Sequence, residues 1–213
     1  MQSLRALAAA IGLAATTASA APPTTAELEE ICAPAEDTVQ CARLVEAMQL
    51  KRLPNLARRD GRVLSISLYP SGTATFTDSE DQLNGKFYSL WDYIDGLNAV
   101  LLYTTAGQTT TFTLLQRTTN RRIELPTEPQ LAPDRQRLAT ADICEKRCSN
   151  EIIIWRATPE GIRKELAWSP PAGWIDAGAK WKDADILSIE YATADGPGKI
   201  DRALSDPSWK RVQ

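Results

Sequence analysis

The spacing of apolar residues along the sequence changes once, from every three or four positions to every second position. Between Glu27 and Leu50, apolar residues recur every three or four positions, which is the spacing of an amphipathic helix. Pro34 interrupts this pattern, so we expect one short helix from about Glu27 and a second over residues 38–50. From Val63 onward apolar and polar residues alternate, as in strands with one buried face. The sequence therefore predicts a helical segment followed by a β-rich body.

Short antiparallel strands are expected throughout this body. Residues 63–69 alternate, Pro70-Ser71-Gly72 supplies a turn, and residues 73–77 alternate again, which predicts a hairpin. Nearly every later connection contains Gly, Pro, Asn or Asp, and such turns between short strands indicate an all-β fold of antiparallel sheets. Further strands are predicted near residues 87–94, 98–105, 109–118, 121–125, 137–143, 151–157, 162–168, 185–192 and 199–204.

The first twenty residues have the form of a secretion signal. Arg5 precedes an apolar stretch without charge, and Ala18-Ser19-Ala20 offers small residues before a cut. A transmembrane helix needs about 20 apolar residues, and this stretch is shorter. We therefore expect cleavage after Ala20 and a protein that is periplasmic or secreted and not embedded in a membrane.

The remaining chain divides at the change of period. Residues 21–61 are expected to form a helical cap, and residues 62–213 an all-β domain. The basic residues between Lys51 and Arg62 are interpreted as a solvated connector between the two.

Four cysteines remain after cleavage: Cys32, Cys41, Cys144 and Cys148. An even number in an oxidising compartment indicates two disulfides, for which three pairings exist. Proximity in the sequence favours Cys32–Cys41 and Cys144–Cys148, and the first pair would join the two predicted helices as a hairpin. The second pair could instead bind zinc, but the chain has no histidine to complete such a site.

A weak internal repeat suggests the kind of sheet. Residues 113–125 and 153–166 each show a strand, a polar turn and a return strand, about 40 residues apart. Between them lies the run Leu131-Ala132-Pro133-Asp134-Arg135-Gln136-Arg137-Leu138-Ala139. This run resembles the Ser-Pro-Asp-Gly-Lys-Arg-Leu-Ala turn of TolB-type and WD-repeat β-propellers, with Ala132 replacing Ser and Arg135 replacing Gly. Residues 181–187 resemble the turn of the next blade.

The wider layout is similar to that of uncharacterised proteobacterial secreted proteins, in which a cysteine-bearing helical leader precedes propeller-like blades. This resemblance implies an architecture and no activity. A complete propeller needs at least four blades, and about twelve predicted strands would make three. We therefore expect blade-like meanders that form an incomplete or small β-propeller or a β-sandwich, or that close through a partner.

Composition excludes several functions. The formal charge of −3, or −4 once Arg5 is removed, comes from scattered charges and argues against a nucleic-acid partner. The absence of histidine excludes nucleophile–histidine triads and removes the commonest metal ligand near neutral pH. We expect neither a metal nor a cofactor.

Acidic residues are the remaining candidates for chemistry. Asp92 with Asp95, or Asp183 with Asp185, would suit a glycosidase if the carboxyl groups lay about 5–9 Å apart. The oxygen-rich stretch Asp78–Gly85 would suit calcium, but it lacks the spacing of an EF-hand loop. We interpret all of these as turn residues and solvated positions on strands.

Five of the six tryptophans follow residue 150. Exposed aromatic residues favour protein hot spots or sugar stacking, whereas buried ones pack between blades. Trp174, Trp181, Trp91 and Tyr93 are the candidate partner-binding residues. Trp174 and Trp181 are expected on either side of a glycine-rich turn. The leading hypothesis is a non-enzymatic binding protein for another envelope protein, for example an inhibitor or immunity partner of an envelope-acting enzyme. The alternative is a protein that binds or acts on carbohydrate through Trp and Asp; the oligomeric state stays open.

Overall fold

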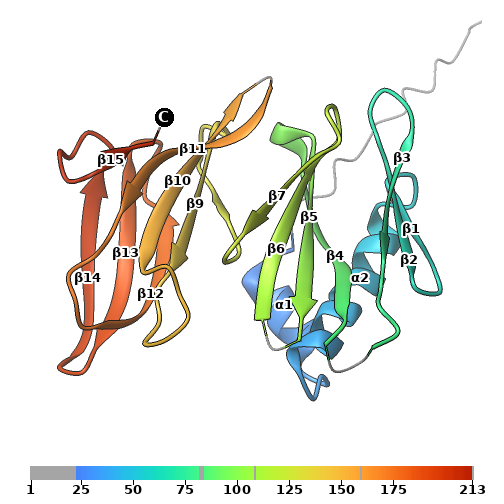
Figure 1. Cartoon of the computed structure of the whole chain (residues 1–213), viewed down its shortest axis with the longest axis horizontal. Coiled ribbons are helices and arrows are strands. Elements are labelled where there is room, and N and C mark those ends of the chain that lie inside the picture. Colours follow the sequence, from blue (N-terminus) through green and yellow to red (C-terminus); the bar gives the residue numbers. More distant parts are fainter. Residues whose placement is uncertain (1–22, 82–83, 108, 159, 213) are drawn as a thin grey trace, which may run out of the picture.

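The computed structural model describes residues 23–81, 84–107, 109–158 and 160–212. The expected signal segment, residues 1–20, lies outside these ranges. Within them the protein is mainly β, with two short α-helices at the beginning (Figure 1). None of the described helices is long and apolar enough to cross a membrane.

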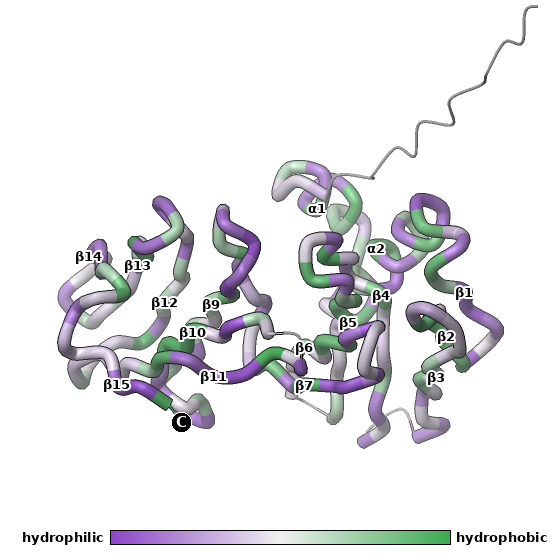
Figure 2. Tube along the Cα trace, turned by 90° about the horizontal axis from the view of Figure 1, so that it is seen from above, coloured by the Kyte–Doolittle hydropathy of each residue, from purple (hydrophilic) through white to green (hydrophobic). Residues whose placement is uncertain are grey.

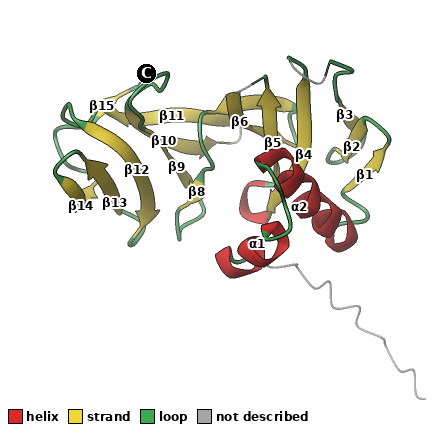
Figure 3. Cartoon of the chain, turned by 90° about the horizontal axis from the view of Figure 1, so that it is seen from below, coloured by secondary structure: helices red, strands yellow, loops and turns green. Residues whose placement is uncertain are grey.

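The two helices form the predicted disulfide-linked hairpin. Helix α1 (Thr25–Cys32) begins with a capping box, in which the Thr24 and Glu27 side chains each accept the other residue's backbone N–H. Helix α2 (Thr38–Arg52) begins at Asp37, whose side chain caps its first turn. The Cys32–Cys41 disulfide joins the helices, which confirms the predicted pairing. Helix α2 packs against a neighbouring strand, β4 (Figure 3).

The described strands form four antiparallel sheets, in which strand order nearly follows chain order. The first sheet contains β1 (Ala57–Asp60), β2 (Val63–Ser67) and β3 (Thr73–Thr77). The second contains β4 (Lys86–Ile94), β5 (Ala99–Ala106), β6 (Thr109–Gln116) and β7 (Arg121–Leu125). The third contains β8 (Gln130–Leu131), β9 (Arg137–Asp142), β10 (Glu151–Thr158), β11 (Gly161–Trp168) and β15 (Lys210–Arg211). The fourth contains β12 (Trp174–Trp181), β13 (Ile186–Thr193) and β14 (Gly196–Ala203).

The sheets stand face to face in one row along the long axis of the molecule, in chain order (Figure 1). Three clusters of buried side chains fill the spaces between consecutive sheets. On β5, Leu101 packs against the third sheet and Leu102 against the first. On β10, Ile153 packs against the second sheet and Ile152 against the fourth. Because side chains alternate along a strand, a central sheet needs apolar residues on both faces, and β5 and β10 have them. The fold is therefore an open row of blade-like meanders.

The two outermost faces of the row are polar. On β3, Ala74 and Phe76 point inward while the threonines between them are exposed. On β13, Leu187 and Ile189 are buried against the third sheet, and Glu190 lies on the opposite, exposed face. Figure 2 shows this alternation of hydrophobic and hydrophilic residues along the trace. As in the terminal repeats of repeat proteins, polar outer faces end the row, so its core does not require a partner to cover it.

Two turns use an aspartate to fix the strand that follows. In the run that resembles the propeller signature, Asp134 Oδ1 accepts the backbone N–H of Gln136 at 2.9 Å. Arg135, which replaces glycine of the signature, has a φ of 56°, in the left-handed region that favours glycine. Asp183 accepts two backbone N–H groups of its own turn, both at 2.8 Å. These carboxylates therefore replace missing backbone partners in the turns.

Two sequence interpretations are wrong. The basic run between Lys51 and Arg62 is not a solvated connector, because Arg58 and Arg59 belong to β1 and the Arg59 side chain is only 15% exposed. The segment between Trp174 and Trp181, taken as a glycine-rich turn, is strand β12.

Candidate functional site

The four predicted partner-binding residues pack into three different cores. On β4, Trp91 packs between the second and third sheets, and Tyr93 packs between the first and second. Trp174 and Trp181 begin and end β12 and pack between the third and fourth sheets. All four are only partly exposed, so each is at least partly a packing residue.

Trp174 is held in place by other rings. It stacks on Tyr191 with ring centroids 3.9 Å apart and meets Trp168 edge-on at 5.6 Å. The Tyr191 ring in turn occupies the space above Gly198, where a Cβ would lie 2.3 Å from a ring carbon. A face of Trp174 is thus already covered, which leaves it poorly suited to stack on a ligand.

Trp91 and Trp181 hold the same segment from different sheets. Trp91 Nε1 donates to the Glu128 carboxylate, and Trp181 Nε1 donates to the backbone oxygen of Gln130, each at 2.8 Å. The segment leading into β8 is therefore fixed between the second and fourth sheets. It forms one wall of a groove.

This groove, called here the β12 groove, has a volume of about 340 Å³. One wall is the strand β12 itself, over residues 176–180, and the opposite wall includes Thr127 and Glu128. Ala139 and Ala141 of β9 also line it, and these small side chains leave room between the third and fourth sheets.

The backbone of β12 is open toward the groove. Among the described residues, β12 is an edge strand of the fourth sheet, hydrogen-bonded only to β13 apart from one isolated bridge between Asp176 and Cys144. On the groove side, β8 pairs with β9 only at Leu138 and Ala139. Alternate residues of an edge strand direct their N–H and C=O groups away from the sheet, where they are available to another strand.

Both ends of the β12 groove are closed. At one end lies the hydrogen bond from Trp181 to Gln130. At the other, the bridge between Cys144 and Asp176 lies beside the second predicted disulfide, Cys144–Cys148, which is also confirmed. A β-bulge next to this end leaves Ile175 exposed, and bulges commonly redirect side chains beside functional sites.

Acidic residues outnumber basic residues in the lining of the groove, which is otherwise mostly neutral. Glu128, Asp142 and Asp176 contribute carboxylates, and Lys180 contributes the one amine of that lining. The hydroxyl of Thr127 is buried in the lining and has no hydrogen-bond partner within the described residues. Such unpaired buried groups are uncommon, because each loses its bonds to water on folding.

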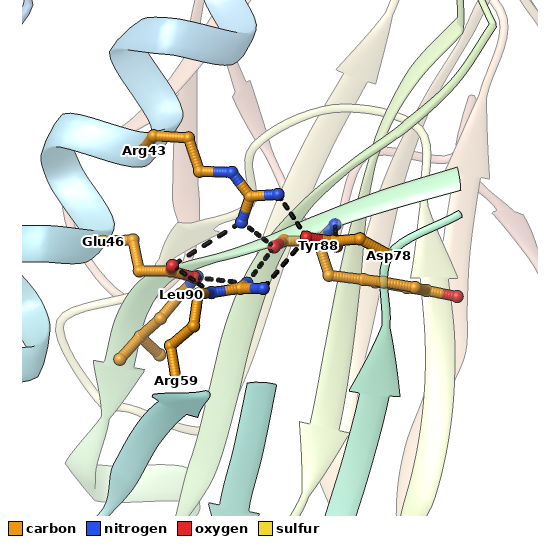
Figure 4. Close-up of polar contacts among 6 residues, drawn as sticks. All are labelled: Arg43, Glu46, Arg59, Asp78, Tyr88 and Leu90. Carbon is orange, nitrogen blue, oxygen red and sulfur yellow. Dashed lines mark hydrogen bonds and ion pairs between the residues drawn. The ribbon is translucent and has the colours of Figure 1, made fainter. Parts of the chain in front are cut away.

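A second polar arrangement, the ionic cluster, contains Arg43, Glu46, Arg59 and Asp78 (Figure 4). Arg59 donates to Glu46 through Nε at 2.5 Å and through Nη2 at 2.9 Å, and its Nη1 donates to Asp78 at 2.9 Å. Arg43 Nη2 donates to the same Asp78 oxygen at 2.5 Å. The two carboxylates are 4% and 6% exposed, and each is bonded to arginine.

The ionic cluster also covers the free edge of β4. The backbone oxygen of Tyr88 accepts from Arg43 and Arg59 at 2.7 and 2.6 Å, and the backbone N–H of Leu90 donates to Glu46 at 2.8 Å. These side chains take the place of a neighbouring strand, which protects the edge from pairing with other chains. The cluster is therefore structural, and β4 differs from β12 in having its edge occupied.

Sequence reasoning missed this cluster and misjudged one of its members. Asp78 was the first oxygen of the candidate calcium stretch, but its carboxylate is bonded to Arg43, Arg59 and the backbone N–H of Tyr88. It is therefore committed to the cluster and not free to bind a cation. Residues 82 and 83 of that stretch lie outside the described ranges.

The candidate carboxylate pairs differ in their surroundings. Burial raises the pKa of Asp92, with the nearby charge of Glu128 acting in the same direction, while hydrogen bonds from the Tyr93 backbone and Gln49 oppose this shift. Asp95 lies in the short 3-10 helix that follows β4. Asp183 accepts the backbone bonds of its own turn, as interpreted from the sequence.

Comparisons with known proteins supply no relative. No family model, no curated protein and no solved structure matches the chain. The two disulfides indicate an oxidising environment.

Proposed function

We propose that this protein is a non-enzymatic binding protein of the periplasm or the extracellular space, and that it engages another protein through the β12 groove. The observation that carries the proposal is the open backbone edge of β12 beside a preformed groove. Unpaired strand edges are recognition sites for other chains, and this one is kept accessible while the β4 edge is covered.

The surroundings of the groove support binding. The disulfide Cys144–Cys148 and the hydrogen bond from Trp181 to Gln130 hold its ends, so little ordering is needed when a partner enters. Ile175 adds an exposed apolar side chain next to the opening. One specific form of the proposal is an inhibitor or immunity partner of an envelope-acting enzyme.

Affinity capture tests the proposal with two matched variants. Asp176→Lys changes the charge at the groove wall, and Asp195→Lys makes the same change in the exposed turn between β13 and β14. Wild type and Asp195→Lys should retain one envelope protein that Asp176→Lys retains weakly. Failure of wild type to retain any protein under these conditions would contradict the proposal.

A second candidate function rests on another cavity, of about 380 Å³, on the solvent side of the fourth sheet. Trp181 borders it beside Lys180 and two ion pairs, Lys182–Asp201 and Lys199–Glu190. A tryptophan beside polar groups suits a saccharide. Retention on peptidoglycan or polysaccharide that is lost in Lys199→Ala, with no protein captured, would favour this candidate.

A further inference from the structure

We infer that the β12 groove binds a basic, extended polypeptide segment by strand addition, so that the segment becomes a fourth strand of the fourth sheet. This inference rests on the proposed function and specifies the binding mode and the chemistry of the partner.

The fourth sheet has a free edge at β12 that could take a further strand. The third sheet, its neighbour in the row, has five strands, whereas the fourth has three, as the first does. Strand β12 packs on β9 and β8, so its free edge lies beside the third sheet. The bridge between Cys144 and Asp176 is antiparallel and occupies this edge only at Asp176, the third residue of β12. A segment that continues from that bridge would meet residues 177–180.

The dimensions fit a short segment. Residues 177–180 line the groove beyond the bridge at Asp176, and four residues of a strand span about 14 Å at about 3.4 Å each. One face of an added strand would lie toward Ala141, a small and partly exposed side chain of β9. The other face would remain toward solvent, because successive side chains of a strand alternate.

The charges of the lining select the partner. Glu128, Asp142 and Asp176 outnumber Lys180, so the groove favours lysine or arginine over acidic residues. Asp142 already accepts the backbone N–H of Ser149 at 2.8 Å, which fixes its carboxylate at the closed end. Main-chain hydrogen bonds to β12 would supply affinity, and the carboxylates would supply selectivity.

Synthetic peptides test this mode directly. The probe is the blocked heptapeptide Thr-Val-Lys-Ala-Lys-Val-Thr, compared with the same peptide carrying Glu in place of Lys, by calorimetric titration at low salt. We expect binding of the lysine peptide that is at least about tenfold tighter and that weakens with added salt. Asp176→Lys should lower the affinity by about fivefold to tenfold, and Asp195→Lys should not change it.

Backbone methylation separates strand addition from attraction between side chains. Two versions of the lysine peptide carry N-methyl groups on alternate nitrogens, one set on odd and one on even positions. Only alternate N–H groups of an added strand face β12, so one version should lose binding and the other should keep it. Equal loss from both versions, or no loss from either, would overturn strand addition.

The outcomes distinguish this inference from the proposed function. Equal affinity for the lysine and glutamate peptides, or equal behaviour of Asp176→Lys and Asp195→Lys, would overturn the inference. A captured envelope protein together with no peptide binding would also overturn it, while the proposed function would stand. If neither a protein nor a peptide binds, both fall.

Discussion

Replacing Glu46 by glutamine should destabilise the protein strongly. Glu46 is 4% exposed and accepts two hydrogen bonds from Arg59 and one from the Leu90 backbone. Removing one partner of a buried ion pair costs about 3–5 kcal/mol, because the remaining charge stays desolvated. Arg59 and Arg43 are 15% and 30% exposed and keep Asp78 as a partner, which lowers the expected cost to about 2–3 kcal/mol. For a chain of this size that corresponds to a fall in Tm of about 4–12 °C.

The matched control is Glu80→Gln. It removes the carboxylate from the 2.7 Å ion pair with Arg62, in which the side chains are 82% and 53% exposed. Such exposed pairs contribute little, so the expected cost is below about 0.5 kcal/mol. Chemical denaturation of both variants measures the difference. Equal and small costs would refute the conclusion that the ionic cluster holds the β4 edge and α2 together.

Three further predictions concern separate features. Asp134→Ala should cost about 1 kcal/mol because Gln136 loses the acceptor of its backbone N–H, and Asp195→Ala should cost less than about 0.5 kcal/mol; equal denaturation midpoints would contradict this. Asp92→Asn should be more stable than wild type at neutral pH. The pKa of Asp92 is raised in the folded protein, so the free energy of unfolding of wild type falls as the pH rises through that pKa. Well below pH 3.8 the Asp92 carboxyl is protonated in both states, and the variant should lose its advantage in stability. An advantage of equal size at both pH values would show that charge is not its cause. The intact mass of exported protein should correspond to a chain that begins at Ala21 and lacks four hydrogens, and free thiols under denaturing conditions would contradict the two disulfides.

Much of the fold follows from local patterns. Apolar residues every three or four positions predicted both helices, and the hairpin of β2 and β3 follows from alternation around Pro70-Ser71-Gly72. The pairing of the cysteines followed from proximity, because short loops bring their ends together readily. These features depend on residues close in the sequence.

Strand β12 could not be recognised in the same way. Its centre is Ala177-Gly178-Ala179, and small residues give neither the alternation nor the β-branched composition of a typical strand. Its pairing with β13 is local, but its packing on β9 joins residues far apart in the sequence and depends on how the third and fourth sheets pack. The same small residues, which do not have the composition of a typical strand, also leave space for the groove.

The ionic cluster was hidden for a different reason. A basic run is usually solvated, and nothing local distinguishes Arg59 from Arg58, although their side chains point to opposite faces of β1. The partners of Arg59 come from α2 and from the end of β3, 13 and 19 residues away. Only the packing of α2 against β4 brings them together.

Amide hydrogen exchange along β12 tests the central claim most directly. The measurement compares the protein alone with the protein saturated by its captured partner or by the lysine heptapeptide. Strand addition predicts slower exchange at alternate amides of residues 177–180, because those N–H groups gain acceptors, and unchanged exchange along β14, the opposite edge of the same sheet. Binding that leaves the β12 amides unchanged, or that protects β14 instead, would contradict the assignment of the β12 groove as the binding site.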